Sequence, residues 1–207
     1  MKVLAMVLAG GKGERLYPLT RDRAKPGVPF GANYRLIDFT LSNCANSDLR
    51  RIVILTQYKS YSLDRHVQHG WNFFSSQMGE YVDIIPAQQR VSDEWYLGTA
   101  DAVYQNIYPL EQERPDITVI LSGDHVYRMD YRRLINFHIL KGASLTVGAI
   151  PMPKELSTQF GVMMVDGNYR IVGFQEKPKV PETIPSNPDM ILASMGIYVF
   201  STETMVK

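Results

Sequence analysis

The stretch LAGGKGERLYPLTRDRAKP, residues 8–26, has the residue types of a phosphate-binding loop. Glycines let the backbone approach an anion closely, and the N–H groups of such a loop can point at it. Arg15 and Lys25 add cations, which suits a triphosphate whose charge must be neutralised during a reaction. The alternative is a glycine turn flanked by solvated basic side chains, and the loop alone favours neither interpretation.

Two well-known phosphate-loop motifs are absent from this stretch. A Walker A loop ends in Gly-Lys followed by Ser or Thr, and no such ending occurs here. The dinucleotide motif G-x-G-x-x-G would need a third glycine where Leu16 stands. The loop therefore favours neither an ordinary ATPase nor a dehydrogenase.

Asp124 is the strongest single candidate for metal binding. It follows the apolar stretch 116–122, DITVILS, which is typical of a buried strand. Open α/β sheets place ligands at the carboxyl ends of their strands, and a carboxylate there can hold Mg²⁺. The alternative role is an ordinary helix or turn cap, but the surrounding motif favours the metal.

Apolar runs alternate with helical patterns along most of the chain. Runs typical of buried parallel strands occupy residues 3–9, 51–56, 81–86, 116–122 and 144–150. Helical patterns occupy residues 36–46, 60–70, 99–108 and 130–141. The alternation predicts an α/β protein with a Rossmann-like, mixed but mainly parallel sheet and helices on both faces.

The pattern changes near residue 160. Residues 161–165 and 169–174 predict a hairpin, because the turn sequence Asp166-Gly167-Asn168 separates them. A proline-rich loop is expected over residues 177–188, and GIYVF at residues 196–200 predicts another strand.

The composition excludes several kinds of partner. A net charge of +1 gives no basic field for nucleic acid or for an anionic membrane. No segment approaches the roughly 20 apolar residues that a membrane helix needs. The single cysteine, Cys44, suits a reducing compartment. We therefore expect a cytoplasmic protein with no nucleic-acid or membrane partner.

Longer motifs are similar to one family. LAGGKGERLYPLTRDRAKP resembles the signature of the sugar-nucleotide pyrophosphorylases. WYLGTADAVYQN, LSGDHVYRMDY, FQEKP and ASMGIYVF narrow the resemblance to bacterial-type glucose-1-phosphate adenylyltransferases, also called ADP-glucose pyrophosphorylases. The similarity extends over essentially the whole chain. It implies the nucleotide-diphospho-sugar transferase fold and the synthesis of ADP-glucose for glycogen or starch.

The implied reaction joins ATP and glucose 1-phosphate to give ADP-glucose and pyrophosphate. Its nucleophile is a phosphate oxygen that is already ionised at neutral pH, so no general base is required. The sequence agrees, because it has no G-x-S-x-G elbow, no H-E-x-x-H motif and no paired cysteines. Such an enzyme must hold two anions in line and neutralise charge, with Mg²⁺ as its cofactor.

The resemblance also implies residue roles. The catalytic residues would be Arg15, Lys25 and Asp124, with Asp124 holding the metal. The nucleotide would contact Leu8, Ala9, Gly10, Gly11, Gln88, Gly98, Thr99, Ala100 and Asp101. Glucose 1-phosphate would contact Tyr96, Gly161, Glu176, Lys177 and Ser194. Thr99 as a helix cap and Glu176-Lys177 as a solvated pair are the alternatives.

Members of this family are longer than 207 residues. We therefore expect residues 1–207 to be a catalytic domain truncated at its C-terminal end, without the family's second metal-binding aspartate and C-terminal β-helix. When full length, the protein would be a homotetramer. Transfer from UTP, dTTP or GTP is one alternative function, and a non-catalytic regulatory subunit is another. The presence of Arg15, Lys25 and Asp124 argues against the regulatory subunit.

Overall fold

The computed structural model describes residues 1–88 and 96–206, and the chain divides into two compact units. Unit 1 comprises Met1–Thr146 and Val199–Lys207. Unit 2 comprises Val147–Tyr198. Within the described residues, no helix is long and apolar enough to cross a membrane.

The sheet of unit 1 is built on four parallel strands. Its order is β5-β4-β1-β6, and β10 (Met190–Ser201) is the next neighbour of β6. The four strands are β1 (Val3–Leu8), β4 (Arg51–Thr56), β5 (Tyr81–Pro86) and β6 (Ile117–Ser122). The interiors of β1, β4 and β6 are buried, as their continuous apolar runs predict for strands covered on both faces.

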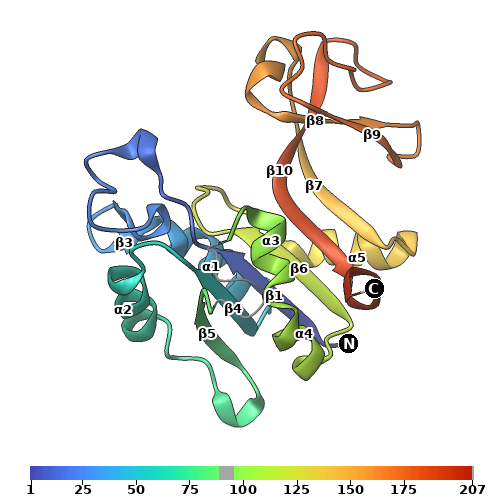
Figure 1. Ribbon diagram of the computed structural model, residues 1–207. Helices are drawn as coiled ribbons and strands as arrows, with labels where there is room; N and C mark the ends of the chain where they lie inside the picture. Colours follow the sequence, from blue (N-terminus) through green and yellow to red (C-terminus); the bar gives the residue numbers. More distant parts are fainter. Residues whose placement is uncertain (89–95, 207) are drawn as a thin grey trace. The chain divides into compact units, whose positions relative to one another are not determined.

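Helices cover both faces of this sheet. Figure 1 shows α3 (Thr99–Tyr104) and α4 (Ile107–Glu113) on the near face and α1 (Leu36–Asn46) on the far face. The remaining helices of unit 1 are α2 (Tyr61–Gly70), α5 (Tyr131–Lys141) and α6 (Thr202–Val206). The predicted fold class, a mixed and mainly parallel sheet flanked by helices, is confirmed.

Capping explains where two of these helices begin. The Asp38 carboxylate accepts a hydrogen bond from the Arg35 N–H at 2.7 Å, which satisfies a backbone donor at the start of α1. Asp130 caps α5 by accepting from the Arg132 N–H at 3.1 Å, and Gly142 ends the helix with a φ of 56°.

The helix predicted over residues 99–108 is interrupted, which the sequence pattern did not indicate. α3 ends at Tyr104, and α4 starts at Ile107. Pro109 has no N–H, so it cannot continue the hydrogen-bond ladder back to residue 105. The Asn106 side chain instead donates to the Ala102 carbonyl at 2.7 Å.

Short elements fill the long connection between β1 and α1. They are the 3₁₀ helices η1 (Glu14–Leu16) and η2 (Lys25–Gly27) and the paired strands β2 (Pro29–Phe30) and β3 (Tyr34–Arg35). A further 3₁₀ turn, η3 (Ser76–Met78), precedes β5.

Unit 2 is built around an antiparallel hairpin. The predicted hairpin is confirmed as β8 (Gly161–Val165) and β9 (Ile171–Glu176), but its second strand begins two residues later than expected. The cause is the Asp166 carboxylate, which accepts from the N–H groups of Asn168 and Arg170, while Tyr169 has a φ of 61°.

The rest of unit 2 supports this hairpin. β8 pairs with β10 in antiparallel register, and β7 (Leu145–Pro153) also pairs with β10. By residue number, β7 and β10 each belong partly to unit 1 and partly to unit 2. The 3₁₀ helix η4 (Lys154–Gln159) connects β7 to β8. The strand predicted at residues 196–200 is part of the longer β10.

Candidate functional site

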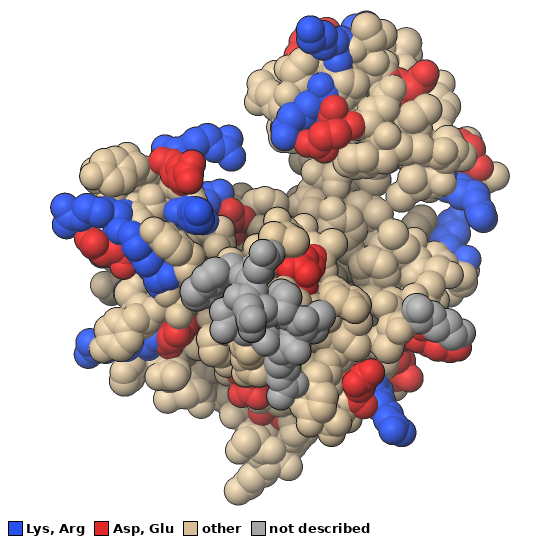
Figure 2. All heavy atoms as spheres, viewed as in Figure 1, with Lys and Arg blue, Asp and Glu red and all other residues tan. Residues whose placement is uncertain are grey.

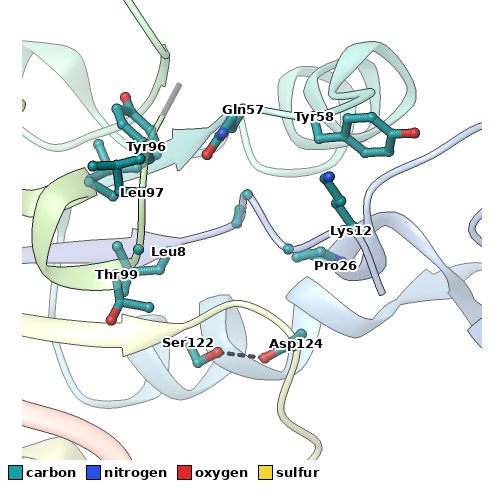
Figure 3. A pocket seen from close by; sticks show the side chains of 16 residues that line it. Leu8, Lys12, Pro26, Gln57, Tyr58, Tyr96, Leu97, Thr99, Ser122 and Asp124 are labelled. Carbon is teal, nitrogen blue, oxygen red and sulfur yellow. Dashed lines mark hydrogen bonds between the residues drawn. The ribbon is translucent and has the colours of Figure 1, made fainter. Parts of the chain in front are cut away.

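A cavity of about 920 Å³ lies at the carboxyl ends of the unit 1 strands. In the strand register, Leu8 is the partner of Leu55 on β4 and of Ser122 on β6, so the loops after three strands begin at the same edge. Figure 3 shows side chains from these loops and from the start of α3 around the cavity. Parallel sheets place ligands at this edge.

Backbone hydrogen bonds join the glycine loop to the neighbouring strand ends. The Ala9 N–H donates to the Leu55 carbonyl at 2.9 Å, and the Gly123 N–H donates to the Leu8 carbonyl at 2.9 Å. A Cβ on Gly123 would lie 3.2 Å from that same Leu8 oxygen. A Cβ on Gly11, by contrast, would meet no atom within 4 Å. The loop is therefore fixed at its base, and its tip has room for a ligand.

Lys25 and Asp124 form an ion pair at this edge, although 99 residues separate them. Lys25 Nζ lies 2.7 Å from Asp124 Oδ2, and the two side chains are 27% and 22% exposed. The Ser122 hydroxyl donates to the other carboxylate oxygen of Asp124, as the dashed line in Figure 3 marks. Lys25 is itself held by its N–H, which donates to the Gly11 carbonyl at 3.2 Å.

These partners keep the Asp124 carboxylate ionised. Burial by itself would raise its pKa, because a charged group is less stable away from water. Hydrogen bonds from Lys25 and Ser122, with the charges of Lys25 and His125, outweigh burial and lower the pKa of Asp124 below its ordinary value. At neutral pH the cavity therefore contains a negative charge beside a lysine.

The residues described around Asp124 are suited to Mg²⁺, which needs few protein ligands. Among the described residues, no group of three or more His, Cys, Asp or Glu side chains is arranged to hold a metal ion. Mg²⁺ commonly takes only one or two carboxylates and completes its shell with waters and substrate phosphates. Asp124 is ionised and lines the cavity, so it has the charge and the position that such a ligand needs.

The start of α3 forms another wall of the cavity. Gly98 is the N-cap of this helix and therefore offers no capping side chain, so the alternative role of Thr99 as the helix cap is wrong. Gly98 and Thr99 instead line the cavity. Asp101 has a local role, because its carboxylate accepts from the Leu97 N–H and from the Gln105 side chain, both at 2.9 Å.

The structure brings together eight of the residues that the resemblance implies for the site. The residues of this set that line the cavity are Leu8, Ala9, Gly10, Gly11, Tyr96, Gly98, Thr99 and Asp124. Ala100 and Asp101 belong to α3 but are not among the lining residues, and neither are Arg15 and Lys25. Arg15 is an exposed residue of η1. The binding roles of all these residues stay predictions.

Gln88 lies elsewhere in unit 1. It lines a second cavity, of about 450 Å³, together with Asp83 and Glu113. The carboxyl groups of Asp83 and Glu113 make this second cavity acidic and unlike a phosphate site. Burial and the charge of Glu113 raise the pKa of Asp83. The nucleotide contact implied for Gln88 stays a prediction.

The other residues implied for glucose 1-phosphate lie in unit 2. Gly161 on β8 is the register partner of Glu176 on β9, and Lys177 Nζ lies 2.9 Å from Glu176 Oε1. Lys177 has a φ of 46°, an uncommon conformation for a residue other than glycine. The Ser194 hydroxyl accepts from the Gly196 N–H at 3.3 Å. Gly161, Glu176 and Lys177 therefore lie at the open end of the β8–β9 hairpin, opposite its turn.

Sequence reasoning missed eight of the residues that line the cavity. Four of them have polar side chains: Lys12, Gln57, Tyr58 and Ser122. Lys12 Nζ lies 6.0 Å from the centroid of the Tyr58 ring, and Figure 3 shows the two side chains close together. The rule that identified Asp124 after β6 applies equally to Gln57 and Tyr58, which directly follow β4. That signal could have found them.

Basic side chains gather near the glycine loop. Figure 2 shows several Lys and Arg residues on the part of unit 1 formed by the β1–α1 connection, which carries Lys12, Arg15, Arg21 and Arg23. Only part of this charge is neutralised locally, as when Arg21 Nε lies 2.8 Å from Asp22. A chain with a net charge of +1 thus concentrates positive charge next to the cavity.

Strand ends, a glycine loop, nearby cations and one ionised carboxylate together form a site whose chemistry suits a ligand that contains phosphate. The comparisons with known proteins agree, because residues 4–207 match the pattern of the nucleotidyl transferase family. The chain belongs to this family.

The most informative relatives have a more specific name. The chain is 58% identical over 202 residues to glucose-1-phosphate adenylyltransferase of Rhodopirellula baltica, covering 97% of this chain and 45% of that protein. It is 55% identical to glucose-1-phosphate adenylyltransferase of Hydrogenovibrio crunogenus, covering 98% of this chain and 48% of the relative. The resemblance predicted from motifs is confirmed, and the chain spans about half the length of the curated relatives it matches.

Proposed function

We propose that this chain belongs to an enzyme that transfers the adenylyl group of ATP to α-D-glucose 1-phosphate, giving ADP-glucose and pyrophosphate. The observation that carries the proposal is the cavity where the glycine loop meets the Lys25–Asp124 pair. The choice of ATP and glucose 1-phosphate is supported by the names of the relatives. The product would be a glucosyl donor for glycogen or starch synthesis.

The chemistry requires positioning more than acid–base catalysis. An ionised oxygen of the sugar phosphate attacks the α-phosphorus of ATP, and the bond from that phosphorus to the bridging oxygen of pyrophosphate breaks. N–H groups of the glycine loop would hold the triphosphate, and Arg15 and Lys25 would neutralise the charge that accumulates on the leaving pyrophosphate. No proton needs to be removed from the nucleophile.

Nucleotidyltransferases of this family generally use Mg²⁺. Asp124 is the residue that would hold it in this chain, because its carboxylate is ionised and lines the cavity. A bound Mg²⁺ would neutralise phosphate charge and polarise the α-phosphate. Lys25 and Ser122 would keep Asp124 ionised and oriented before the metal arrives.

Glucose 1-phosphate would be recognised in unit 2 by Glu176 and Lys177, with Gly161 and Ser194. A contact with Tyr96 rests on the resemblance alone. Both charged side chains are more than half exposed, so they are available to a ligand. Lys177 would contact the phosphate of the sugar, and Glu176 would accept hydrogen bonds from sugar hydroxyls. The uncommon backbone conformation of Lys177 supports a functional role, since such strain is concentrated at binding sites.

Three further parts of the proposal rest on the resemblance alone. Residues 1–207 would belong to the catalytic domain, the whole enzyme would be a homotetramer, and it would act in the cytoplasm. Light scattering on the whole enzyme tests the tetramer directly. A mass of one or two chains would contradict that part without affecting the proposed reaction.

The experiment that tests the function is pyrophosphate release with Mg²⁺, glucose 1-phosphate and, separately, ATP, UTP, dTTP and GTP. It uses both this chain and the longest natural polypeptide that contains it. We expect release with ATP in the longer polypeptide and loss of release in its Asp124→Asn variant. Pyrophosphate release with UTP, dTTP or GTP but not with ATP would mean that the enzyme uses a nucleotide with a different base. ATP binding without release in either polypeptide would favour a regulatory subunit.

A further inference from the structure

We propose that Thr20 is a positioning residue that holds Lys25 opposite Asp124. This inference rests on the proposed function, in which Lys25 contacts phosphate. Thr20 is not among the residues that line the cavity, so it would act through Lys25 and not by touching the nucleotide.

The first observation is the burial of the Thr20 hydroxyl group in a connection that is otherwise largely exposed. Thr20 is only 6% exposed, although the residues on either side of it, Leu19 and Arg21, are exposed. Its hydroxyl donates to the Gly13 carbonyl at 3.0 Å. A buried hydroxyl without a hydrogen-bond partner is unfavourable. The bond to Gly13 therefore explains how the Thr20 hydroxyl can be buried at this position.

The second observation is that Gly13 lies directly between Thr20 and Lys25. A Cβ on Gly13 would lie 2.7 Å from Lys25 Cβ and 3.0 Å from Thr20 Cγ2, both too close for ordinary packing. Gly13 also has a φ of 68°, a conformation that favours glycine. The Gly13 backbone is thus in contact with both side chains at their base.

The third observation links this contact to the ion pair. The Lys25 N–H donates to the Gly11 carbonyl at 3.2 Å. Residues 11–13 therefore support Lys25 through this hydrogen bond and through the packing of Gly13 against its side chain. Lys25 Nζ then reaches Asp124 at the end of β6. If the Thr20 hydroxyl no longer anchored the Gly13 carbonyl, this support would be free to move, and the lysine would no longer be fixed over Asp124.

Two variants separate the hydroxyl from the shape of the side chain. Thr20→Val keeps the branched shape but removes the hydrogen-bond donor, and Thr20→Ser keeps the donor. A matched control is Thr118→Val, because the Thr118 hydroxyl is also buried and bonds to Thr202 at 2.8 Å, at the opposite end of β6. The control loses a similar hydrogen bond far from Lys25. If Thr20→Val does not fold, Thr20→Ala replaces it.

The first measurement uses no nucleotide. Trace labelling with acetic anhydride, quantified by mass spectrometry, reports how accessible Lys25 Nζ is, with the exposed Lys141 as an internal reference. We expect Thr20→Val to raise Lys25 labelling about threefold and to leave Lys141 unchanged, because loss of one hydrogen bond shifts a local equilibrium by this order. Thr20→Ser and Thr118→Val should label like the unmodified chain.

The second measurement is the affinity for ATP with Mg²⁺ by calorimetry. Thr20→Val should weaken binding about fivefold, the size of one lost hydrogen bond, and Thr20→Ser should restore it. In a Lys25→Ala background the same change should have almost no effect, because the residue through which Thr20 acts is gone. A residue with only a structural role would weaken binding equally in both backgrounds.

Two results would overturn the inference: Lys25 labelling unchanged by Thr20→Val, or an equal loss of ATP affinity with and without Lys25. The proposed function fails in a different way. If the unmodified chain bound no ATP and the longer polypeptide released no pyrophosphate, the enzyme assignment would be lost. The labelling result would still decide whether Thr20 positions Lys25.

Discussion

The chain contains two lysine–carboxylate pairs that the proposed reaction uses, and they are built in opposite ways. Lys25 and Asp124 are 99 residues apart, lie 2.7 Å from each other in unit 1 and are mostly buried. Glu176 and Lys177 are neighbours in the chain, lie 2.9 Å apart in unit 2 and are 62% and 58% exposed.

The difference shows how burial changes what an ion pair does. A mostly buried pair is weakly screened, so Lys25 holds Asp124 ionised and in one orientation. An exposed pair contributes little to stability and leaves both side chains free to turn toward a ligand. The first pair suits a site that must be ready before the nucleotide binds. The second suits a site whose side chains turn toward a sugar phosphate.

The largest effect expected is the loss of turnover in Asp124→Asn. The amide keeps the shape of the side chain but removes the charge that would hold Mg²⁺, so pyrophosphate release should fall about 10² to 10³-fold. Release is measured with ATP, glucose 1-phosphate and Mg²⁺ in the longest natural polypeptide that contains this chain. Retention of more than about a tenth of the activity would contradict the central role of this pair.

The next largest effect is the loss of stability expected when the glycine beside each ion pair is replaced by alanine. Gly13→Ala should destabilise the chain by about 2 kcal/mol, because its φ is positive and the new Cβ would be 2.7 Å from Lys25 Cβ. Gly161→Ala should cost less than about 1 kcal/mol, since the new Cβ would meet the end of the exposed Phe174 ring, which can rotate away.

Urea unfolding of both glycine variants measures this difference. Comparable losses of stability would show that the surroundings of the two pairs are equally rigid. That result would remove the contrast between them.

The contribution of the Lys25–Asp124 pair to stability should also depend on pH. The pKa of Asp124 is lowered in the folded chain, so its ion pair stabilises the fold fully above the ordinary value of 3.8. The stabilisation is lost as the pH falls through the lower folded pKa. Lys25→Met should therefore be less stable than the unmodified chain by about 1 to 2 kcal/mol at neutral pH, and the gap should shrink toward about pH 3.

Thermal unfolding at a series of pH values tests this expectation. Lys141→Met serves as the control, because Lys141 is an exposed lysine of the same unit. A gap that stayed constant with pH would mean that Lys25 acts through packing and not through the charge of Asp124.

The smallest effect expected is the change in stability of Lys177→Met. Removing an exposed partner should alter the free energy of unfolding by less than about 0.5 kcal/mol. The same variant should raise the KM for glucose 1-phosphate several-fold, if Lys177 binds the substrate and the transition state alike. An unchanged KM would leave this pair as an ordinary surface contact.

The secondary structure was predictable wherever the local pattern was strong. The strands at residues 51–56 and 81–86 and the helix at residues 36–46 have the expected bounds, because their apolar residues repeat regularly. The helix over residues 99–108 was wrong because one proline outweighed the periodicity, and the start of β9 was wrong because Asp166 competed for backbone donors.

The sequence provided candidate site residues, whose binding roles stay predictions, but it did not provide the geometry of the site. Motif resemblance identified Gly11, Lys25 and Asp124, and strand-end reasoning identified Asp124 independently. Neither approach could show that Lys25 pairs with Asp124, because no local pattern relates residues 99 positions apart. Tyr58 was missed although it follows a strand, because tyrosine more often packs than binds.

The sequence by itself determined the strands, most helices, the glycine loop and the family, because these depend on residue types at short spacing. Only the tertiary structure decided which groups meet. The parallel register of β1, β4 and β6 brings three loops to one edge. Gly13 packs against Thr20 and Lys25, and Lys25 meets Asp124. The physical reason is that burial and distance, which control the charge of Asp124, arise only when the chain is folded.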